Sequence, residues 1–181
     1  MKLSVFVGTS LDGFIARADG SFDFLPVDTT EDHGYDGFFA SVDLLVMGRK
    51  TYETALGFGG WPYGPKPVFV LSSRPLAPAP EGAVVERMAG PPAEIVARLD
   101  ARGFRHAYLD GGATIQGFLA ASLVQRLVVT RVPVLIGAGI PLFGPLPADL
   151  LLRHVATRTF ASGLVQGEYE VVGPRPGEGA R

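Results

Sequence analysis

Short apolar runs separated by polar, glycine-rich turns recur along the chain and predict alternating strands and helices. The runs of strand length are rich in β-branched and aromatic residues, which favours strands buried in a sheet. They cover residues 3–8, 42–47, 67–71, 83–86 and 124–132, together with the run that ends at Ala107-Tyr108-Leu109-Asp110.

Between these runs, apolar residues recur at the i, i+3, i+4 spacing of an amphipathic helix. The segments with this pattern, or with helix-start residues, are 28–40, the turn starting at 48, 91–102 and 115–121. In the first segment Asp28, Thr29 and Thr30 are candidate caps, while Gly34 and Gly37 weaken the helix.

The C-terminal part has the pattern of a β-hairpin. Residues 150–160 and 164–172 read as strands, and Ala161-Ser162-Gly163 forms the turn between them. The whole order predicts an α/β fold of three layers: a mostly parallel central sheet with flanking helices and a C-terminal antiparallel hairpin. We expect residues 1–173 to form one domain and residues 174–181 a disordered tail.

A glycine pair after a buried strand is the feature most suggestive of chemistry. The stretch Gly111-Gly112-Ala113-Thr114-Ile115 follows a strand and opens a helix. The first backbone N–H groups of such a helix are free, and the helix dipole favours negative charge there. A phosphate or pyrophosphate suits this place, although a glycine pair after a strand is also typical of an ordinary tight turn.

Two more polar turns follow apolar strands, namely Gly48-Arg49-Lys50-Thr51 and Ser72-Ser73-Arg74. Ligands of mostly parallel sheets bind at the carboxyl ends of the strands, where all three turns fall. A helix N-terminus for a pyrophosphate, with an arginine and hydroxyls at a separate point, is what NADPH requires. Taken singly, each turn has an ordinary interpretation as a solvated helix start or turn.

Composition narrows the possible functions. The 181 residues are 47% hydrophobic, carry a net charge of −2 and include no cysteine. Disulfides, thiol catalysis and thiolate metal sites are therefore excluded. The absence of a basic run argues against a nucleic-acid partner, and no apolar run approaches the length of a membrane span. We expect a cytoplasmic protein.

Several other residues are weaker candidates. His33, His106 and His154 have no metal-ligand spacing, so we expect structural or surface roles and no metal site. Trp61 could line a ring-binding pocket or cover the edge of the sheet. Pro141 follows Gly137-Ala138-Gly139 where a dinucleotide-binding helix would have to run, so this is no dinucleotide fingerprint.

The three polar turns, extended to Met47-Gly48-Arg49-Lys50-Thr51-Tyr52-Glu53, Val70-Leu71-Ser72-Ser73-Arg74-Pro75 and Gly111-Gly112-Ala113-Thr114, resemble the NADPH-binding segments of the dihydrofolate reductase fold. The segments 10–16 and 133–143 more specifically resemble the reductase domain of the bifunctional riboflavin-biosynthesis deaminase-reductase and its stand-alone bacterial relatives. The resemblance extends from residue 1 to about residue 172 and is specific for fold and cofactor more than for substrate.

The resemblance implies roles for individual residues. Arg49, Lys50 and Thr51, after Gly48, would meet the phosphates of NADPH, and Ser72, Ser73 and Arg74 would hold its 2′-phosphate end. Gly111, Gly112, Ala113 and Thr114, with Ile115 following, would bind the pyrophosphate. Val7 and Gly8 would lie beside the nicotinamide, with Asp12 near the substrate.

The source of a proton is open at this point. Dihydrofolate reductases carry a carboxylate in the first long helix, and here Glu31, Asp32 and Asp36 are available, with Asp32 preferred by its distance from Gly48. These acids could equally stabilise a helix N-terminus. The zinc ligands of the deaminase domain, H-x-E and P-C-x-x-C, have no match, so deamination is excluded.

These observations favour an NADPH-dependent reductase that passes hydride to a small heterocycle, either a pterin or a 5-amino-6-ribosylaminouracil-type pyrimidine. The activity would resemble that of dihydrofolate reductase or 5-amino-6-(5-phosphoribosylamino)uracil reductase. The alternative is an NADP(H)-binding module of the same fold that acts as a sensor or scaffold. The resemblance also implies a homodimer, which would cover the apolar connection 133–143.

Overall fold

The structure, a computed structural model, describes residues 1–26 and 31–174. The expected caps Asp28, Thr29 and Thr30 and residues 175–181 of the expected tail lie outside the described residues. In chain order the elements are β1 (Lys2–Ser10), β2 (Phe14–Ala16), α1 (Tyr35–Ala40), β3 (Leu44–Gly48), α2 (Arg49–Leu56), β4 (Val68–Leu71), β5 (Val85–Met88), α3 (Pro92–Ala101), β6 (His106–Asp110), α4 (Gly112–Ala120), β7 (Arg126–Val132), β8 (Ile140–Pro141), β9 (Leu150–Thr159) and β10 (Val165–Pro174).

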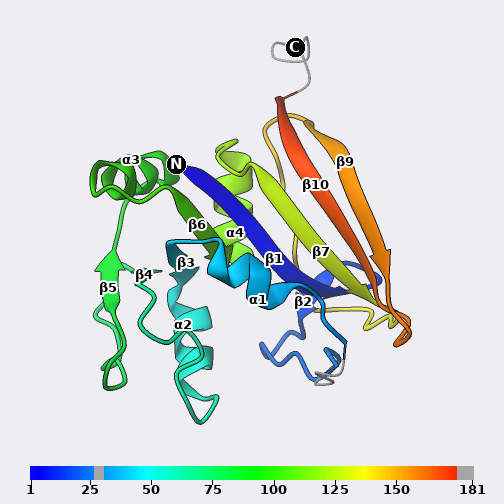
Figure 1. Ribbon diagram of the computed structural model, residues 1–181, viewed down its shortest axis with the longest axis horizontal. Coiled ribbons are helices and arrows are strands. Elements are labelled where there is room, and N and C mark those ends of the chain that lie inside the picture. Colours follow the sequence, from blue (N-terminus) through cyan, green and yellow to red (C-terminus); the bar gives the residue numbers. More distant parts are fainter. Residues whose placement is uncertain (27–30, 175–181) are drawn as a thin grey trace.

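The described residues build an eight-stranded sheet in the order β5-β4-β3-β6-β1-β7-β10-β9 (Figure 1). The six strands from β5 to β7 are parallel to one another. Strand β10 runs antiparallel to both β7 and β9, which forms the predicted hairpin. The predicted fold class, a mostly parallel sheet with helices and an antiparallel C-terminal hairpin, is confirmed.

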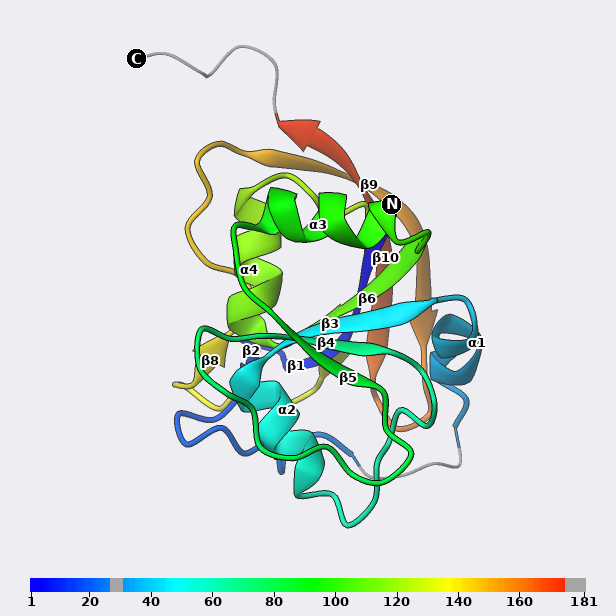
Figure 2. The ribbon, with the colours of Figure 1, turned by 90° about the vertical axis from the view of Figure 1, so that its left-hand side faces the viewer.

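Two apolar cores lie on opposite faces of this sheet. One joins alternate residues of the central strands to α3 and α4, through side chains such as Ile95, Leu99, Ile115 and Phe118. The other joins the remaining face to α1 and α2, through Phe38, Tyr52 and Ala55. Figure 2 shows α3 and α4 on the opposite side of the sheet from α1. The alternation of side chains along each strand therefore produces the predicted three layers.

The first helix is shorter than the sequence predicts. We expected a helix over 28–40, but α1 begins at Tyr35 and the preceding described residues are irregular. Gly34 has a φ of 80°, a left-handed conformation that suits glycine, and the Asp32 carboxylate accepts a hydrogen bond from the Gly34 N–H at 2.7 Å. This local bond competes with helical hydrogen bonding and explains the late start.

Other parts of the chain also differ from prediction. Helix α4 begins at Gly112, three residues before Ile115, because the glycine turn itself forms its first turn. Strand β10 reaches Pro174, so the first residue of the expected disordered tail belongs to the hairpin. Strands β2 and β8 form a separate two-stranded sheet within segments that we read as a turn and an apolar connection.

Candidate active site

The three polar turns lie side by side at one edge of the sheet. Strand β3 pairs in parallel with β4 and with β6, so the carboxyl ends of the three strands are adjacent. In register, Gly48 lies opposite Leu71, the residue before Ser72, and Met47 lies opposite Asp110, the residue before Gly111. The convergence expected from strand order is therefore present.

The turn at Gly111 packs directly on the start of α2. Gly111 has a φ of 88°, and a Cβ added there would lie 2.2 Å from Thr51 Oγ1. A Cβ at Gly48 would lie 3.2 Å from Thr114 Oγ1, so the starts of α2 and α4 are in mutual contact. Neither helix has a side-chain cap at its N-terminus. Two helix N-termini with uncapped N–H groups at one place suit a pyrophosphate.

Ile115 and Thr114, which were predicted to bind the cofactor, are less available than their neighbours. Ile115 is fully buried in the core, and its N–H already donates to the Gly111 carbonyl at 2.9 Å. Thr114 is also buried. Ala113 is exposed, and Gly112 is buried against Ile15 and Pro141. The polar groups that this turn can offer a ligand are the first backbone N–H groups of α4, which have no side-chain cap.

The turn after β4 leaves its arginine free. The Ser72 hydroxyl donates to the Arg74 carbonyl at 2.8 Å and accepts from the Arg74 N–H at 3.0 Å, which fixes the turn. Within the described residues the Arg74 guanidinium has no hydrogen bond or ion pair, and Ser73 is exposed. Lys50 is exposed as well, while Arg49 forms an ion pair with Glu53 at 3.4 Å. An arginine side chain without an ion pair, on a turn whose backbone is held by hydrogen bonds, is suited to binding an isolated phosphate group.

Strand β1 offers unpaired backbone near its carboxyl end. Its pairing with β6 ends at Val5, whereas its pairing with β7 continues to Ser10. Val7 and Gly8 therefore have a ladder partner on one side only. The Val7 side chain packs in the core, and Gly8 is covered by Leu25, whose Cδ2 would lie 2.8 Å from a Cβ at that position. The one-sided pairing fits hydrogen bonding of a carboxamide.

Two of the carboxylates proposed from the sequence, Asp12 and Asp32, accept hydrogen bonds from backbone N–H groups. Asp12 accepts hydrogen bonds from the N–H groups of Gly137 at 2.8 Å and Ile136 at 3.3 Å, which ties the β1–β2 turn to the 133–143 connection. A hydrogen bond from Ser10, with these backbone bonds, lowers the pKa of Asp12. A lowered pKa is unsuited to a proton donor at neutral pH. Asp32 bonds to Gly34, as described above, and Asp36 is exposed on α1.

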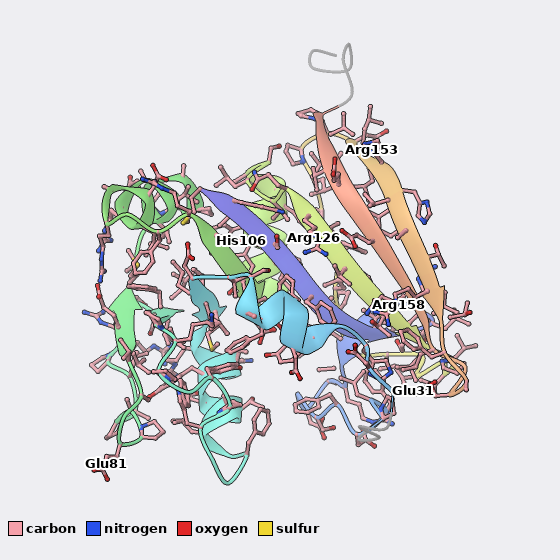
Figure 3. All side chains as sticks on the ribbon, in the orientation of Figure 1. Glu31, Glu81, His106, Arg126, Arg153 and Arg158 are labelled. Atoms are coloured by element: carbon pink, nitrogen blue, oxygen red, sulfur yellow. The ribbon has the colours of Figure 1, made fainter. Side chains whose placement is uncertain are left out.

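Glu31 precedes α1 in the chain and contacts the turn of the C-terminal hairpin. Its carboxylate accepts from the N–H groups of Ala161 at 2.7 Å and Ser162 at 3.3 Å. Nearby, Arg158 donates to the Asp32 carbonyl at 2.7 Å, and Gln166 donates to the His33 carbonyl at 3.1 Å. Figure 3 labels Glu31 and Arg158 in this region, where the C-terminal hairpin lies beside the segment before α1. These bonds fasten the start of α1 to the hairpin.

Asp110 is the acid that sequence reasoning missed as a candidate. It ends β6 directly before the glycine pair, and one of its oxygens accepts the Gly111 N–H at 2.8 Å. Burial raises the pKa of its carboxyl group to about 6. Burial, with the charge of Asp110, raises the pKa of Tyr35 to about 12 and raises the pKa of Tyr63 well above its usual value. The available signal was an acid at the end of an otherwise apolar strand.

Trp61 packs on Tyr52 and Tyr63, with ring centroids 5.9 and 5.0 Å away. It lines a hollow of about 240 Å³ at the C-terminal end of α2, the end opposite the Gly48–Thr51 turn. Trp61 therefore covers part of the core between α2 and the sheet. The hollow that it lines is separate from the three turns, and a role in ring binding stays a prediction.

The ring of His106 makes structural hydrogen bonds through both of its nitrogens. His106 Nδ1 lies 2.8 Å from the Ser41 carbonyl and therefore donates to it, while Nε2 lies 2.8 Å from Ser4 Oγ. Burial lowers the pKa of His106. In the described part of the chain, no group of three or more His, Cys, Asp or Glu could hold a metal ion. No helix there is long and apolar enough to cross a membrane.

Comparison with known proteins decides the family. The family model described as the RibD C-terminal domain matches residues 1–166. The chain belongs to this family. The uncharacterized protein YwjB of Bacillus subtilis (strain 168) is 31% identical over 166 residues, which are 90% of this chain and 94% of that protein. The match therefore spans most of the length of both chains.

Solved structures agree with the assignment. A Shewanella sp. PV-4 protein assigned to riboflavin biosynthesis is 40% identical and superposes with a TM-score of 0.85, covering 94% of this chain and 99% of that one. Dihydrofolate reductase of Enterococcus faecalis, solved with NADP(H), has 21% identity and a TM-score of 0.61, with 94% of each chain covered. The latter shows the shared fold. Family and structural relatives together support an oxidoreductase with a pyrimidine reductase-like role.

Proposed function

We propose that this RibD C-terminal domain is an NADPH-dependent reductase that transfers hydride to a small heterocycle, a pterin or a 5-amino-6-ribosylaminouracil-type pyrimidine. The observation that carries the proposal is the convergence of the turns at Gly48, Ser72 and Gly111 on one edge of the sheet. One turn supplies a free arginine and the other two supply uncapped helix N-termini, which together match the separated phosphates of NADPH.

Each turn has a defined task in this proposal. Gly111 and Gly112 form the turn at the start of α4, where the pyrophosphate binds. Gly111 has to be glycine because a side chain there would collide with Thr51. Arg49, Lys50 and Thr51 contact phosphate oxygens from the start of α2. Ser73 and Arg74 contact the 2′-phosphate, and the one-sided backbone of Val7 and Gly8 orients the nicotinamide. When bound, NADPH supplies the hydride.

Asp110 is our candidate for the proton donor. Its pKa of about 6 leaves a protonated fraction near neutral pH, and it lies one residue before the proposed pyrophosphate turn. A general acid works best when its pKa is near the working pH. The lowered pKa of Asp12 and its bonds to Gly137 and Ile136 favour a positioning role for that residue instead.

The test is NADPH oxidation, followed by its absorbance, with 7,8-dihydropterin and with 5-amino-6-ribosylaminouracil as acceptors. We expect substrate-dependent oxidation with at least one of them, and at least about a hundredfold lower kcat in Asp110→Asn, because general acid catalysis contributes about that much. Tight NADPH binding without turnover of any heterocycle would instead support the alternative, a sensor or scaffold that retains the cofactor site.

We also propose a cytoplasmic homodimer, as expected for a reductase of this family. The apolar connection that suggested an interface does present large side chains to solvent: Leu135 is 70% exposed and Phe143 is 51% exposed. A dimer interface over the 133–143 connection would remove these side chains from water.

A further inference from the structure

Strand β5 carries an arginine that the sequence analysis did not single out, Arg87. The strand lies at one edge of the sheet and pairs in parallel with β4, so its carboxyl end lies beside the turn 72–74 (Figure 1). In register, Arg87 lies opposite Val70, and the Ser72 N–H donates to the Met88 carbonyl at 2.9 Å. Arg87 is therefore next to the turn that we assign to the 2′-phosphate of NADPH.

The Arg87 side chain lies on the face of the sheet that α2 covers. Its neighbour Met88 belongs to the core under α3 and α4, whereas Val85 packs against the core under α1 and α2. Because side chains alternate along a strand, Arg87 shares the face of Val85. Helix α2 packs on this same face through Tyr52. Arg87 and the proposed phosphate-binding start of α2 are therefore on one side of the sheet.

A hydrogen bond ties the Arg87 guanidinium to this turn. Its Nη1 donates to the Ser72 carbonyl at 3.4 Å. The Ser72 hydroxyl donates its proton to the Arg74 carbonyl and accepts from the Arg74 N–H, so it has no O–H left to donate to a phosphate. Ser72 thus holds two arginines beside each other, Arg87 through its carbonyl group and the backbone of Arg74 through its hydroxyl group.

The acid that precedes Arg87 in the chain does not neutralise its charge. Glu86 lies on the opposite face of the strand, where its carboxylate accepts hydrogen bonds from Arg102 at 2.8 and 2.9 Å. Within the described residues the exposed Arg87 forms no ion pair. A guanidinium group has five N–H groups, so the one bond to Ser72 leaves most of them for a ligand.

We propose that Arg87 is a specificity-determining residue of the cofactor site, which binds the 2′-phosphate of NADPH together with Arg74. A phosphate monoester carries a charge of about −1.5 to −2 at pH 7. Guanidinium groups suit it because their paired N–H groups can bond two of its oxygens at once. The inference rests on the proposed reductase function and adds to its cofactor site a residue from a strand outside the three turns.

The experiment measures the dissociation constants of NADPH and NADH by nicotinamide fluorescence for the wild type and for Arg87→Ala. NADH lacks only the 2′-phosphate, so damage to the fold or to the rest of the site would weaken the binding of both nucleotides. We expect Arg87→Ala to weaken NADPH binding at least about fivefold, because it removes hydrogen bonds to a charged group. NADH binding should stay within about twofold of the wild-type value.

Two further variants serve as controls. Arg98→Ala removes an arginine of α3 that donates to the Ala89 carbonyl, and it should leave both dissociation constants unchanged. Arg87→Lys keeps the positive charge but not the paired N–H groups, so it should weaken NADPH binding less than Arg87→Ala does. An unchanged preference for NADPH in Arg87→Ala, or equal weakening of both nucleotides, would overturn the proposal.

Failure of the proposed function has a different signature. A wild-type protein that binds neither nucleotide would overturn the reductase account and this inference together. A wild-type protein that binds NADPH and NADH equally well would overturn the 2′-phosphate site, and with it the role of Arg87. If the wild type prefers NADPH and Arg87→Ala retains that preference, the cofactor assignment stands and the role of Arg87 alone is wrong.

Discussion

At the residue scale, Asp110 and His106 are the groups whose buried environment changes their chemistry most clearly. Asp110 lies at the carboxyl end of β6 and His106 at its other end, so a single strand carries both. Burial disfavours the charged form of each, which raises the pKa of the acid and lowers that of the histidine. Their effects on stability therefore have opposite dependence on pH.

Replacing Asp110 should increase stability at alkaline pH. Because its folded pKa of about 6 lies above the usual 3.8, its contribution is fully present below pH 3.8 and is lost as pH rises through about 6. A shift of about two units is worth up to about 3 kcal/mol. Urea unfolding should show Asp110→Asn more stable than wild type by about 1–3 kcal/mol at pH 8, with the difference shrinking toward pH 4. A difference that does not vary with pH would contradict the buried carboxyl.

His106 should make the protein less stable in acid. Its folded pKa is lowered below the usual 6.5, so its contribution is present above pH 6.5 and is lost as pH falls from there toward the folded value. His106→Gln should remove this part of the pH dependence, which we would measure as the difference in Tm between variant and wild type at pH 7.5 and pH 5. The Asp110 effect cancels in that difference because both proteins contain it.

At the element scale, the contact between the starts of α2 and α4 defines the proposed phosphate site. Parallel strands end at the same edge, so the order β4-β3-β6 brings the turns together wherever the exact helix boundaries fall. The apolar runs of the sequence are sufficient to predict this. The mutual packing of Gly111 on Thr51 is not predictable from them, because it depends on how two helices separated by several elements meet.

Gly111→Ala should damage both this contact and cofactor binding. The residue has a φ of 88° and a Cβ would lie 2.2 Å from Thr51 Oγ1, so the turn must distort. We expect a loss of stability of about 1–3 kcal/mol and at least about tenfold weaker NADPH binding. Gly117→Ala is the control: it lies in α4 with no described atom within 4 Å of its added Cβ, and it should stabilise by about 0.5–1 kcal/mol without weakening NADPH binding.

The start of α1 depends on the distant hairpin, which explains why the first helix was predicted too long. The sequence offers acids before Tyr35 that read as helix-start residues, but Glu31 is drawn to Ala161 and Ser162, about 130 positions away. Asp12 is a similar case, because the two backbone N–H groups that donate to it lie 124 and 125 positions further along the chain. Hydrogen bonds between residues so far apart cannot be deduced from the local sequence pattern. Residue type and spacing identify the acids as candidates but do not show which of them have structural partners.

Loss of the Glu31 contact should loosen this connection. Bonds from Ser162 and Ala161 lower the pKa of Glu31, so the contact is present above the usual pKa of 4.5 and is lost as pH falls below it. We expect Glu31→Ala to speed amide hydrogen exchange in residues 161–163 and in α1 at pH 7. Unchanged exchange in α1 would show that the hairpin does not hold the helix start.

At the scale of the whole molecule, the sequence predicted the layers, the hairpin and the edge of the sheet that carries the turns. It did not predict Asp110 as a candidate, because the burial of an acid at the end of a strand depends on tertiary packing and not on the local sequence. The small β2–β8 sheet was missed for a similar reason, since its strands are 3 and 2 residues long and pair across the chain.

The proposed homodimer can be tested by the mass of the protein in solution. We expect sedimentation at micromolar concentration to give a mass near twice the 19.1 kDa of the chain. Leu135→Glu, which charges the most exposed large apolar side chain of the described residues, should shift the population toward monomer if the 133–143 connection forms the interface. Sedimentation of the wild type as a monomer would contradict the dimer.

The most direct test of the reductase account is a fluorescence titration of the protein with NADPH and with NADH, repeated for Arg74→Ala and for the control Arg98→Ala. Arg74 is the free guanidinium assigned to the 2′-phosphate, whereas Arg98 lies on α3 and donates to the Ala89 carbonyl. The account predicts tight NADPH binding and a preference over NADH that Arg74→Ala abolishes and Arg98→Ala retains. Binding of neither nucleotide by the wild-type protein would contradict it.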